Sequence, residues 1–131
     1  MFLDFIHVVQ ITSCVMMLSR ILRRSFSVQV IQGEQQLSAV LASSTEQLVV
    51  VDWTASWCGP CKMIAPVFQS LAEKHPQVVF VKVDVDEHME AAQRAGVSAM
   101  PTFQFIKNQQ VVQQFAGADA QKLTKLVEEL K

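Results

Sequence analysis

Apolar runs alternate with amphipathic stretches through residues 28–131, and this alternation predicts an α/β fold. Residues 48–51 form a continuous apolar run of Leu and Val, which is typical of a strand covered on both faces of a sheet. The stretch after it has an apolar stripe at helical spacing, which predicts a helix that ends at His75-Pro76. The residues of this stripe are Met63, Ile64, Val67, Phe68 and Leu71.

The other patterns extend the order of elements to β-α-β-α-β-α-β-β-α. Alternating residues near the end predict a hairpin joined at Asn108-Gln109, although no glycine follows Asn108 and the turn type stays open. Asp119 is expected to cap the closing helix. We expect strands at residues 28–31, 48–51, 78–85, 102–106 and 111–115, and further helices at residues 33–41, 87–95 and 119–130. This order implies a central mixed sheet of about five strands with helices on both faces.

Composition supports one domain and narrows the function classes. The 131 residues are 50% hydrophobic, enough for one substantial core. A formal net charge of −1 does not indicate a nucleic-acid-binding protein. The chain has three cysteines, too few for a disulfide-stapled secreted domain, and only Cys58 and Cys61 lie beyond residue 27.

The first 27 residues differ from the rest and are excluded from the predicted domain at residues 28–131. They carry three arginines and one aspartate, a formal charge of +2, whereas the remainder carries eight bases and eleven acids, a charge of −3. At helical spacing, one face of this segment is apolar and the opposite face carries Arg20, Arg23 and Arg24. A basic, acid-poor helix of this kind is typical of organelle targeting. Residues 17–27 resemble a mitochondrial presequence, with cleavage expected after Phe26.

Other interpretations of this leader stay open. Residues 2–18 are mostly apolar but interrupted by polar side chains, so they are marginal for crossing a bilayer. The true start could also be Met16 or Met17. A secretory signal fits less well because its positive charge should precede the apolar stretch. We expect a mitochondrial protein whose mature domain has no stable membrane association, or a cytoplasmic or membrane-anchored one if residues 1–18 are not removed.

Cys58 and Cys61 lie where the buried strand gives way to the following helix. Unpaired N–H groups and the helix dipole stabilise negative charge there, so the thiolate form of Cys58 is favoured. A thiolate attacks disulfides, and Cys61, one turn along and further inside, is expected to resolve the mixed disulfide. Gly59 permits the tight link and Pro60 restricts it, so both are expected to tune how easily the pair is reduced.

A C-x-x-C pair can also be half of a zinc site or an inert structural disulfide. Half of a zinc site would require two further ligands, but His75 and His88 lack zinc-ligand spacing and the sequence has no second cysteine pair. An inert structural disulfide is disfavoured by the position of the pair at a helix start.

Residues 49–62, VVVDWTASWCGPCK, resemble the active-site segment of the thioredoxin family. The similarity extends over residues 28–131 through Pro66, Gly96-Val97, Met100-Pro-Thr102 and Lys107-Asn108. It implies the thioredoxin fold and a protein-disulfide reductase that carries electrons in redox homeostasis. It assigns Cys58 as the nucleophile and Cys61 as the resolving thiol.

The resemblance also implies partners. No cofactor is expected to be bound, and an NADPH-dependent thioredoxin reductase is expected to recycle the Cys58–Cys61 disulfide. The clients would be disulfide-containing proteins such as peroxiredoxins, and the protein is expected to be a monomer.

Asp52 is a candidate for proton transfer, and Lys82 is a candidate for a site residue near it. Asp52 ends the valine run, and burial without a countercharge would raise its pKa and suit it to accept the Cys61 proton. A hydrogen-bonded structural aspartate fits the sequence about as well, and the family resemblance favours proton transfer. Lys82 resembles the family lysine near this carboxylate, although a lysine with its amine in solvent is the default interpretation.

The resemblance places substrate binding at Trp57, Met100, Pro101 and Gly117. Pro101 is expected to follow a cis bond, against the general preference for trans. This bond would turn the Met100 backbone towards the thiols, where an extended client segment could pair with it. Trp57 precedes the helix and is expected to be a partly exposed cover over the sulfurs rather than core packing.

Two rival functions use the same fold. Disulfide isomerase and oxidase relatives typically carry His where this chain has Pro60, so the sequence favours a reductant. A non-catalytic adaptor could hold a partner in the same groove, but it would not need both thiols.

Overall fold

One mixed sheet forms the centre of the computed structural model, which describes residues 27–131. Residues 1–26 of the predicted leader, Cys14 among them, lie outside these residues. The strand order is β1-β3-β2-β4-β5; the first three are parallel and the last two antiparallel to their neighbours. The strands are β1 (Gln29–Val30), β2 (Val49–Thr54), β3 (Val79–Asp84), β4 (Thr102–Lys107) and β5 (Gln110–Ala116). The predicted five-stranded α/β architecture is confirmed.

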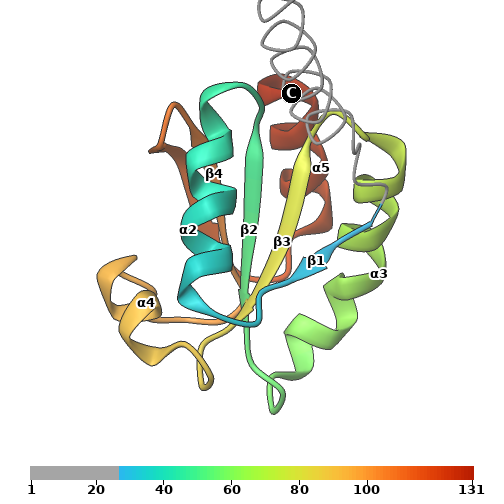
Figure 1. The fold of residues 1–131 in the computed structure, drawn as a ribbon. Coiled ribbons are helices and arrows are strands. Elements are labelled where there is room, and N and C mark those ends of the chain that lie inside the picture. Colours follow the sequence, from blue (N-terminus) through green and yellow to red (C-terminus); the bar gives the residue numbers. More distant parts are fainter. Residues whose placement is uncertain (1–26) are drawn as a thin grey trace, which may run out of the picture.

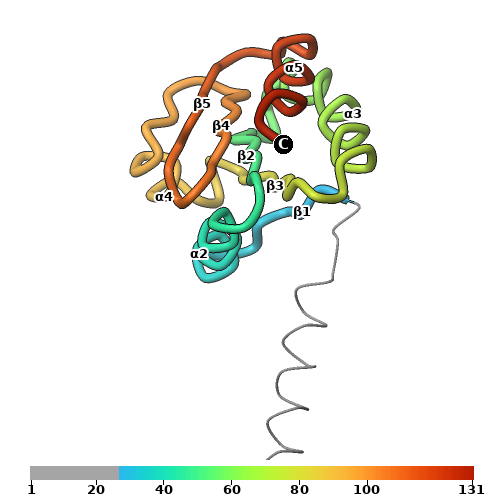
Figure 2. The backbone as a smooth tube through the Cα atoms, turned by 90° about the horizontal axis from the view of Figure 1, so that it is seen from above, coloured from blue at the N-terminus to red at the C-terminus, as the bar shows by residue number. Residues whose placement is uncertain are grey.

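Helices cover both faces of the sheet, as predicted (Figures 1 and 2). Helices α3 and α5 pack on one face, and α2 and α4 lie on the other. Their bounds are α2 (Glu34–Ala42), α3 (Gly59–Lys74), α4 (Met89–Arg94) and α5 (Ala120–Leu130), with a short 3-10 helix η1 (Ser43–Thr45) after α2. Among residues 27–131, none of the helices is long and apolar enough to span a membrane.

Strand β2 divides the hydrophobic core in two. Val50 packs in the cluster beneath α3 and α5, whereas Val49 and Val51 belong to the cluster on the α2 and α4 side. All three are fully buried, which confirms the prediction of a strand covered on both faces. Because side chains alternate along a strand, Asp52 points to the same side as Val50, towards α3.

The structure begins α4 later than the sequence predicts. Residues 84–88 form a turn in which Asp84 Oδ1 accepts hydrogen bonds from the N–H groups of Asp86 (2.8 Å) and Glu87 (3.3 Å). An aspartate that binds the N–H groups just after it favours a turn over helix. Helix α4 therefore begins at Met89 instead of residue 87.

The hairpin turn uses two left-handed residues. Asn108 and Gln109 have φ values of 51° and 61°, and positive φ at both central positions is the requirement of a type I′ turn. The N–H of Asn108 donates to Ser44 O and the N–H of Gln109 donates to Ser44 Oγ, each at 2.8 Å. The turn is thus held against η1 although Gln109 replaces the usual glycine.

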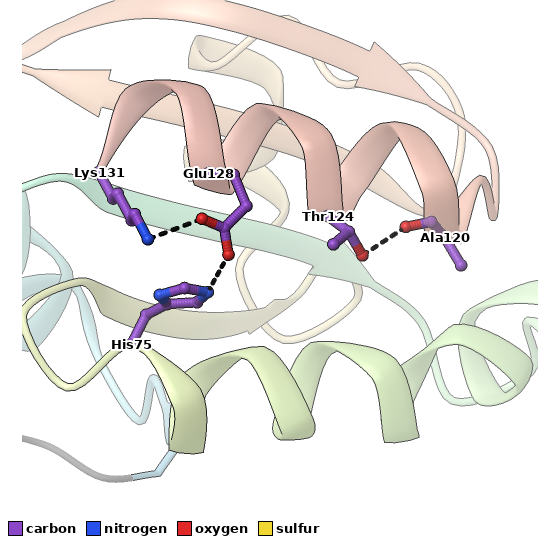
Figure 3. Close-up of polar contacts among 5 residues, drawn as sticks. All are labelled: His75, Ala120, Thr124, Glu128 and Lys131. Carbon is purple, nitrogen blue, oxygen red and sulfur yellow. Dashed lines mark hydrogen bonds and ion pairs between the residues drawn. The ribbon is translucent and has the colours of Figure 1, made fainter.

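A polar contact joins the ends of α3 and α5 (Figure 3). His75 Nε2, from the buried residue that caps α3, lies 2.9 Å from Glu128 Oε1, and Lys131 Nζ lies 2.6 Å from Glu128 Oε2. The hydrogen bond from Lys131 is the main reason why the pKa of Glu128 is below its ordinary value of 4.5, with smaller contributions from the positive charges of Lys131 and His75; desolvation opposes them.

Glu128→Gln is expected to lower stability slightly at neutral pH. A carboxylate with a lowered folded-state pKa stabilises the fold above its unfolded-state value of 4.5, and this contribution disappears as the pH falls through the folded-state value. Urea unfolding at pH 7 and pH 3 should therefore show a larger loss of stability relative to the wild type at pH 7 than at pH 3. Glu129→Gln is the control, because Glu129 makes only a 3.7 Å contact with Lys125. Equal losses at both pH values would contradict this account.

Candidate active site

The two cysteines of the predicted pair are joined where β2 leads into α3. Their sulfurs form a disulfide of 2.17 Å. Cys58 is the N-cap of α3, and the N–H of Cys61 donates to Cys58 Sγ at 3.2 Å. Gly59 and Pro60 are the first two residues of the helix, where the missing N–H of proline costs no helical hydrogen bond.

This position is suited to a negatively charged sulfur. The first N–H groups of a helix have no intrahelical partner, and the helix dipole adds a partial positive charge. Cys58 Sγ already accepts one of these N–H groups, so a thiolate formed there on reduction of the disulfide is stabilised by the same contact.

The expected difference in depth between the two cysteines is not seen in the oxidised form. Cys58 is 4% exposed and Cys61 is 3% exposed. The disulfide holds both sulfurs side by side, so the residues share one environment. They form a small buried cluster with Ala55, against which Met100 packs.

Asp52 is a buried carboxyl group on the same side of β2 as α3. It is 0% exposed, and neither oxygen has a hydrogen-bond partner within the described part of the chain. Burial raises its pKa from 3.8 to about 7, and the charge of Lys82 lowers it in partial opposition. No backbone or side-chain group among residues 27–131 supplies the hydrogen bond that the alternative of a structural aspartate calls for.

Lys82 lies beside Asp52 in the sheet. The two residues are register partners on the parallel strands β2 and β3, so their side chains project to the same face. Lys82 and Cys61 also line one open cavity of about 470 Å³ next to the disulfide. Asp52, Lys82 and Cys61 are thus brought to one region, as the sequence predicts.

The segment before β4 lies next to the disulfide, because its residue Met100 packs against the two cysteines. The Met100–Pro101 bond is cis, as predicted. The N–H of Gly117 donates to Pro101 O at 2.9 Å. Gly117 has a φ of 104°, a conformation that side chains disfavour, which explains glycine at this position.

Trp57 lies on the surface next to the site. It is 65% exposed, which excludes the core-packing alternative. Its Nε1 donates to Asp86 Oδ2 at 2.9 Å. Sequence analysis missed Asp86, because the two residues lie 29 positions apart in different loops and no local pattern connects them.

Metal-ligating side chains do not cluster within residues 27–131: the structure holds no group of three or more His, Cys, Asp or Glu that could bind a metal there. The two histidines weighed as zinc ligands have other partners. His75 contacts Glu128, and His88 Nε2 lies 3.2 Å from Ile31 O.

Comparison with known proteins identifies the family. The thioredoxin family model matches residues 27–130. A thioredoxin from Ovis aries is 48% identical over 103 residues, which are 79% of this chain and 98% of the relative. The solved structure of reduced Schistosoma mansoni thioredoxin has a TM-score of 0.75 at 41% identity, covering 80% of this chain and 99% of that one.

A yeast structure is also similar, with a TM-score of 0.72, 33% identity, and coverage of 81% of this chain and 98% of that one. It comes from a study of how a yeast mitochondrial 1-Cys peroxiredoxin is resolved by the glutathione and thioredoxin systems.

The mixed sheet with a cysteine pair at the start of a helix defines a thiol–disulfide oxidoreductase. The chain belongs to the thioredoxin family. It is a protein-disulfide reductase that works by thiol–disulfide exchange through Cys58 and Cys61.

Proposed function

We propose that Cys58 attacks the client and Cys61 completes the exchange. The Cys58 thiolate forms a bond to one client sulfur while the client S–S bond breaks and the other client sulfur leaves as a thiolate. Cys61 gives its proton to Asp52, attacks Cys58 Sγ and releases the second client thiolate. The client gains two electrons, and Cys58 and Cys61 become a disulfide. The observation that carries this proposal is the N-cap position of Cys58, with the Cys61 N–H donating to its sulfur.

Asp52 is the proton acceptor in this scheme. A carboxyl group with a pKa of about 7 can both take and return a proton near neutral pH. Its position beneath α3 supports transfer from Cys61, which faces inward from the first turn of that helix. The charge of Lys82 moderates the rise in the pKa of Asp52.

The client would bind as an extended segment along Met100. Met100 packs against the disulfide cluster, and the next residue, Pro101, is held by the Gly117 N–H, so the Met100 backbone would be available to pair with a client strand. The exposed indole of Trp57, next to Cys58 in the chain, offers a further apolar contact. Gly59 and Pro60 tune the reduction of the pair by restricting the link between the two sulfurs.

The electrons would come from NADPH through a thioredoxin reductase. Two electrons per cycle restore the dithiol, and the reduced protein passes them to clients such as peroxiredoxins. Family membership supports this route, and the yeast relative was studied with a mitochondrial peroxiredoxin. We propose a monomer whose mature domain binds neither nucleic acid nor a membrane stably.

The protein would act in mitochondria. Residues 1–27 support this location by their basic, acid-poor composition and by the residues around Phe26, which resemble a matrix-protease site. The family match begins at residue 27, where the mature protein would start.

Import into isolated mitochondria tests the location. The labelled full chain should become protease-resistant and shorter, only when the membrane potential is present, and its new N-terminus should lie near Ser27. Arg20→Gln combined with Arg23→Gln and Arg24→Gln should abolish import, whereas the same number of lysine-to-glutamine changes at Lys122, Lys125 and Lys131 should not. Recovery of the full-length chain in the membrane fraction would contradict cleavage and support an anchor.

A further inference from the structure

The loop that carries Met100 and Pro101 is held to the sheet by three hydrogen bonds to its carbonyl groups. We refer to residues 95–101, between α4 and β4, as the substrate loop. Gln104 Nε2 donates to Ala95 O at 3.0 Å, at the start of the loop. Thr102 Oγ1 donates to Ala99 O at 2.5 Å, and the Gly117 N–H donates to Pro101 O at 2.9 Å.

Gln104 differs from the other two donors because its side chain belongs to a buried network. It lies on β4 between β2 and β5, and it is 3% exposed. Its Oε1 accepts from Trp53 Nε1, and its Nε2 also donates to Gln114 Oε1, both at 2.9 Å. Because the indole N–H of Trp53 can only donate, it fixes the amide with Oε1 towards Trp53 and the NH2 group towards Ala95.

The amide adds a tertiary anchor to the first end of the substrate loop, where the N–H groups of Gly96 and Val97 also donate to Gln93 O and Ala92 O, each at 3.0 Å. Ala95 is the C-cap of α4, a helix of six residues, and so short a helix has little stability of its own. Gly96 follows with a φ of 71°, so the chain reverses direction directly after the Gln104 contact. Movement of Ala95 would therefore be transmitted along a few residues to the Met100 backbone.

We propose that Gln104 is a positioning residue for the reduction of protein disulfides: its amide, oriented by Trp53, holds Ala95 O and thereby places the Met100 backbone for client pairing. This inference rests on the proposed binding of clients along Met100. Gln104 touches neither the cysteines nor the client. Loss of its amide is expected to weaken client binding. It should not change the reactivity of Cys58, because that reactivity depends on the start of α3.

The test compares a protein substrate with two small reagents. Gln104→Met keeps the length of the side chain but removes the amide, and because a buried hydrogen bond has a modest net contribution we expect KM for insulin reduction to rise about fivefold with kcat nearly unchanged. Reduction of a small aromatic disulfide and alkylation of Cys58 by iodoacetamide should keep wild-type rates, since neither reagent pairs with the loop.

Gln114→Met is the matched control, because it removes another partner of the Gln104 amide and leaves the contact with Ala95 O. It should keep the wild-type KM. All measurements use the full chain below its melting temperature. If Gln104→Met does not fold, Trp53→Phe removes the N–H that orients the amide and should raise KM in the same direction by a smaller factor.

Pro101→Ala separates this inference from the proposed client binding. If Pro101→Ala raises KM for insulin and Gln104→Met does not, the role of Gln104 is overturned and client binding along Met100 stands. If neither variant raises KM, the proposed binding mode fails and the inference fails with it. Equal slowing of insulin and both small reagents in Gln104→Met would show a general effect on the fold and overturn the positioning role.

Discussion

Cys58→Ser is expected to reduce insulin reduction to the background rate of the assay. A serine hydroxyl is a poor nucleophile at neutral pH, whereas the sulfur at this position becomes a thiolate stabilised by the start of α3. Without the first attack no mixed disulfide forms, so the loss should be complete. The measurement is NADPH consumption coupled through thioredoxin reductase, with insulin as the client.

Two cysteine variants complete this test. Cys61→Ser should retain the first attack and accumulate a mixed disulfide with the client, because Cys58 is intact and the resolving thiol is missing. Cys14→Ser should turn over normally, since Cys14 lies in the predicted leader and outside the family match at residues 27–130. Undiminished turnover by Cys58→Ser would remove Cys58 from the role of nucleophile.

Asp52→Asn is expected to make the oxidised protein more stable at alkaline pH. The pKa of Asp52 is raised from 3.8 to about 7 by burial, so the folded state resists ionisation while the unfolded chain ionises freely. The unfolding free energy therefore falls as the pH rises from 3.8 to about 7 and is constant with respect to this group outside that window. Since one pKa unit is equivalent to 1.36 kcal/mol, the total loss is about 4 kcal/mol.

An asparagine at this position does not ionise and avoids that loss. Urea unfolding at pH 8 should show the variant more stable by up to about 4 kcal/mol, less the cost of burying an amide. The gain from avoided ionisation should vanish near pH 4, where only the cost of burying the amide remains. Glu46→Gln, which changes an exposed carboxylate, is the control and should show no such pH dependence. A stability difference between Asp52→Asn and the wild type that is the same at pH 4 and pH 8 would mean that burial does not raise the pKa of this carboxyl group.

The same substitution should slow the second half of the exchange. Asparagine cannot accept the Cys61 proton, so the mixed disulfide on Cys58 should resolve more slowly at neutral pH. Rapid-mixing experiments should show that this defect diminishes as the pH rises and Cys61 ionises without help. An unchanged resolution rate would remove Asp52 from the mechanism while leaving the stability prediction intact.

The sequence predicted the parts of the fold that follow from local pattern. The buried strand β2 was evident from its run of valines, and Asp119 caps α5 as expected, its side chain accepting from the Lys122 N–H at 2.9 Å. The position of the cysteine pair was predictable for the same reason, because a strand-to-helix junction is a local feature. The family resemblance supplied the cis bond before Pro101.

Contacts between distant loops could not be predicted in this way. Asp86 binds Trp57, and Gln104 binds Trp53 and Ala95, through side chains whose meeting depends on the three-dimensional packing of separate elements. From the sequence alone, a single glutamine on a strand is predicted to face solvent. Only the covering by α4 and the neighbouring strands shows that Gln104 is internal.

The reversed direction of β4 places the hairpin turn between β4 and β5 far from the cysteines. Strand β4 is antiparallel to β2, with Thr102 opposite Trp53. The loop that enters β4 therefore lies at the same end of the strands as the segment that leaves β2 towards Cys58. The Asn108-Gln109 turn consequently lies at the opposite end of β4, one strand length from the cysteines. Evolution or an engineer can lengthen that turn, or attach a label or fusion partner to it, without disturbing the sulfurs.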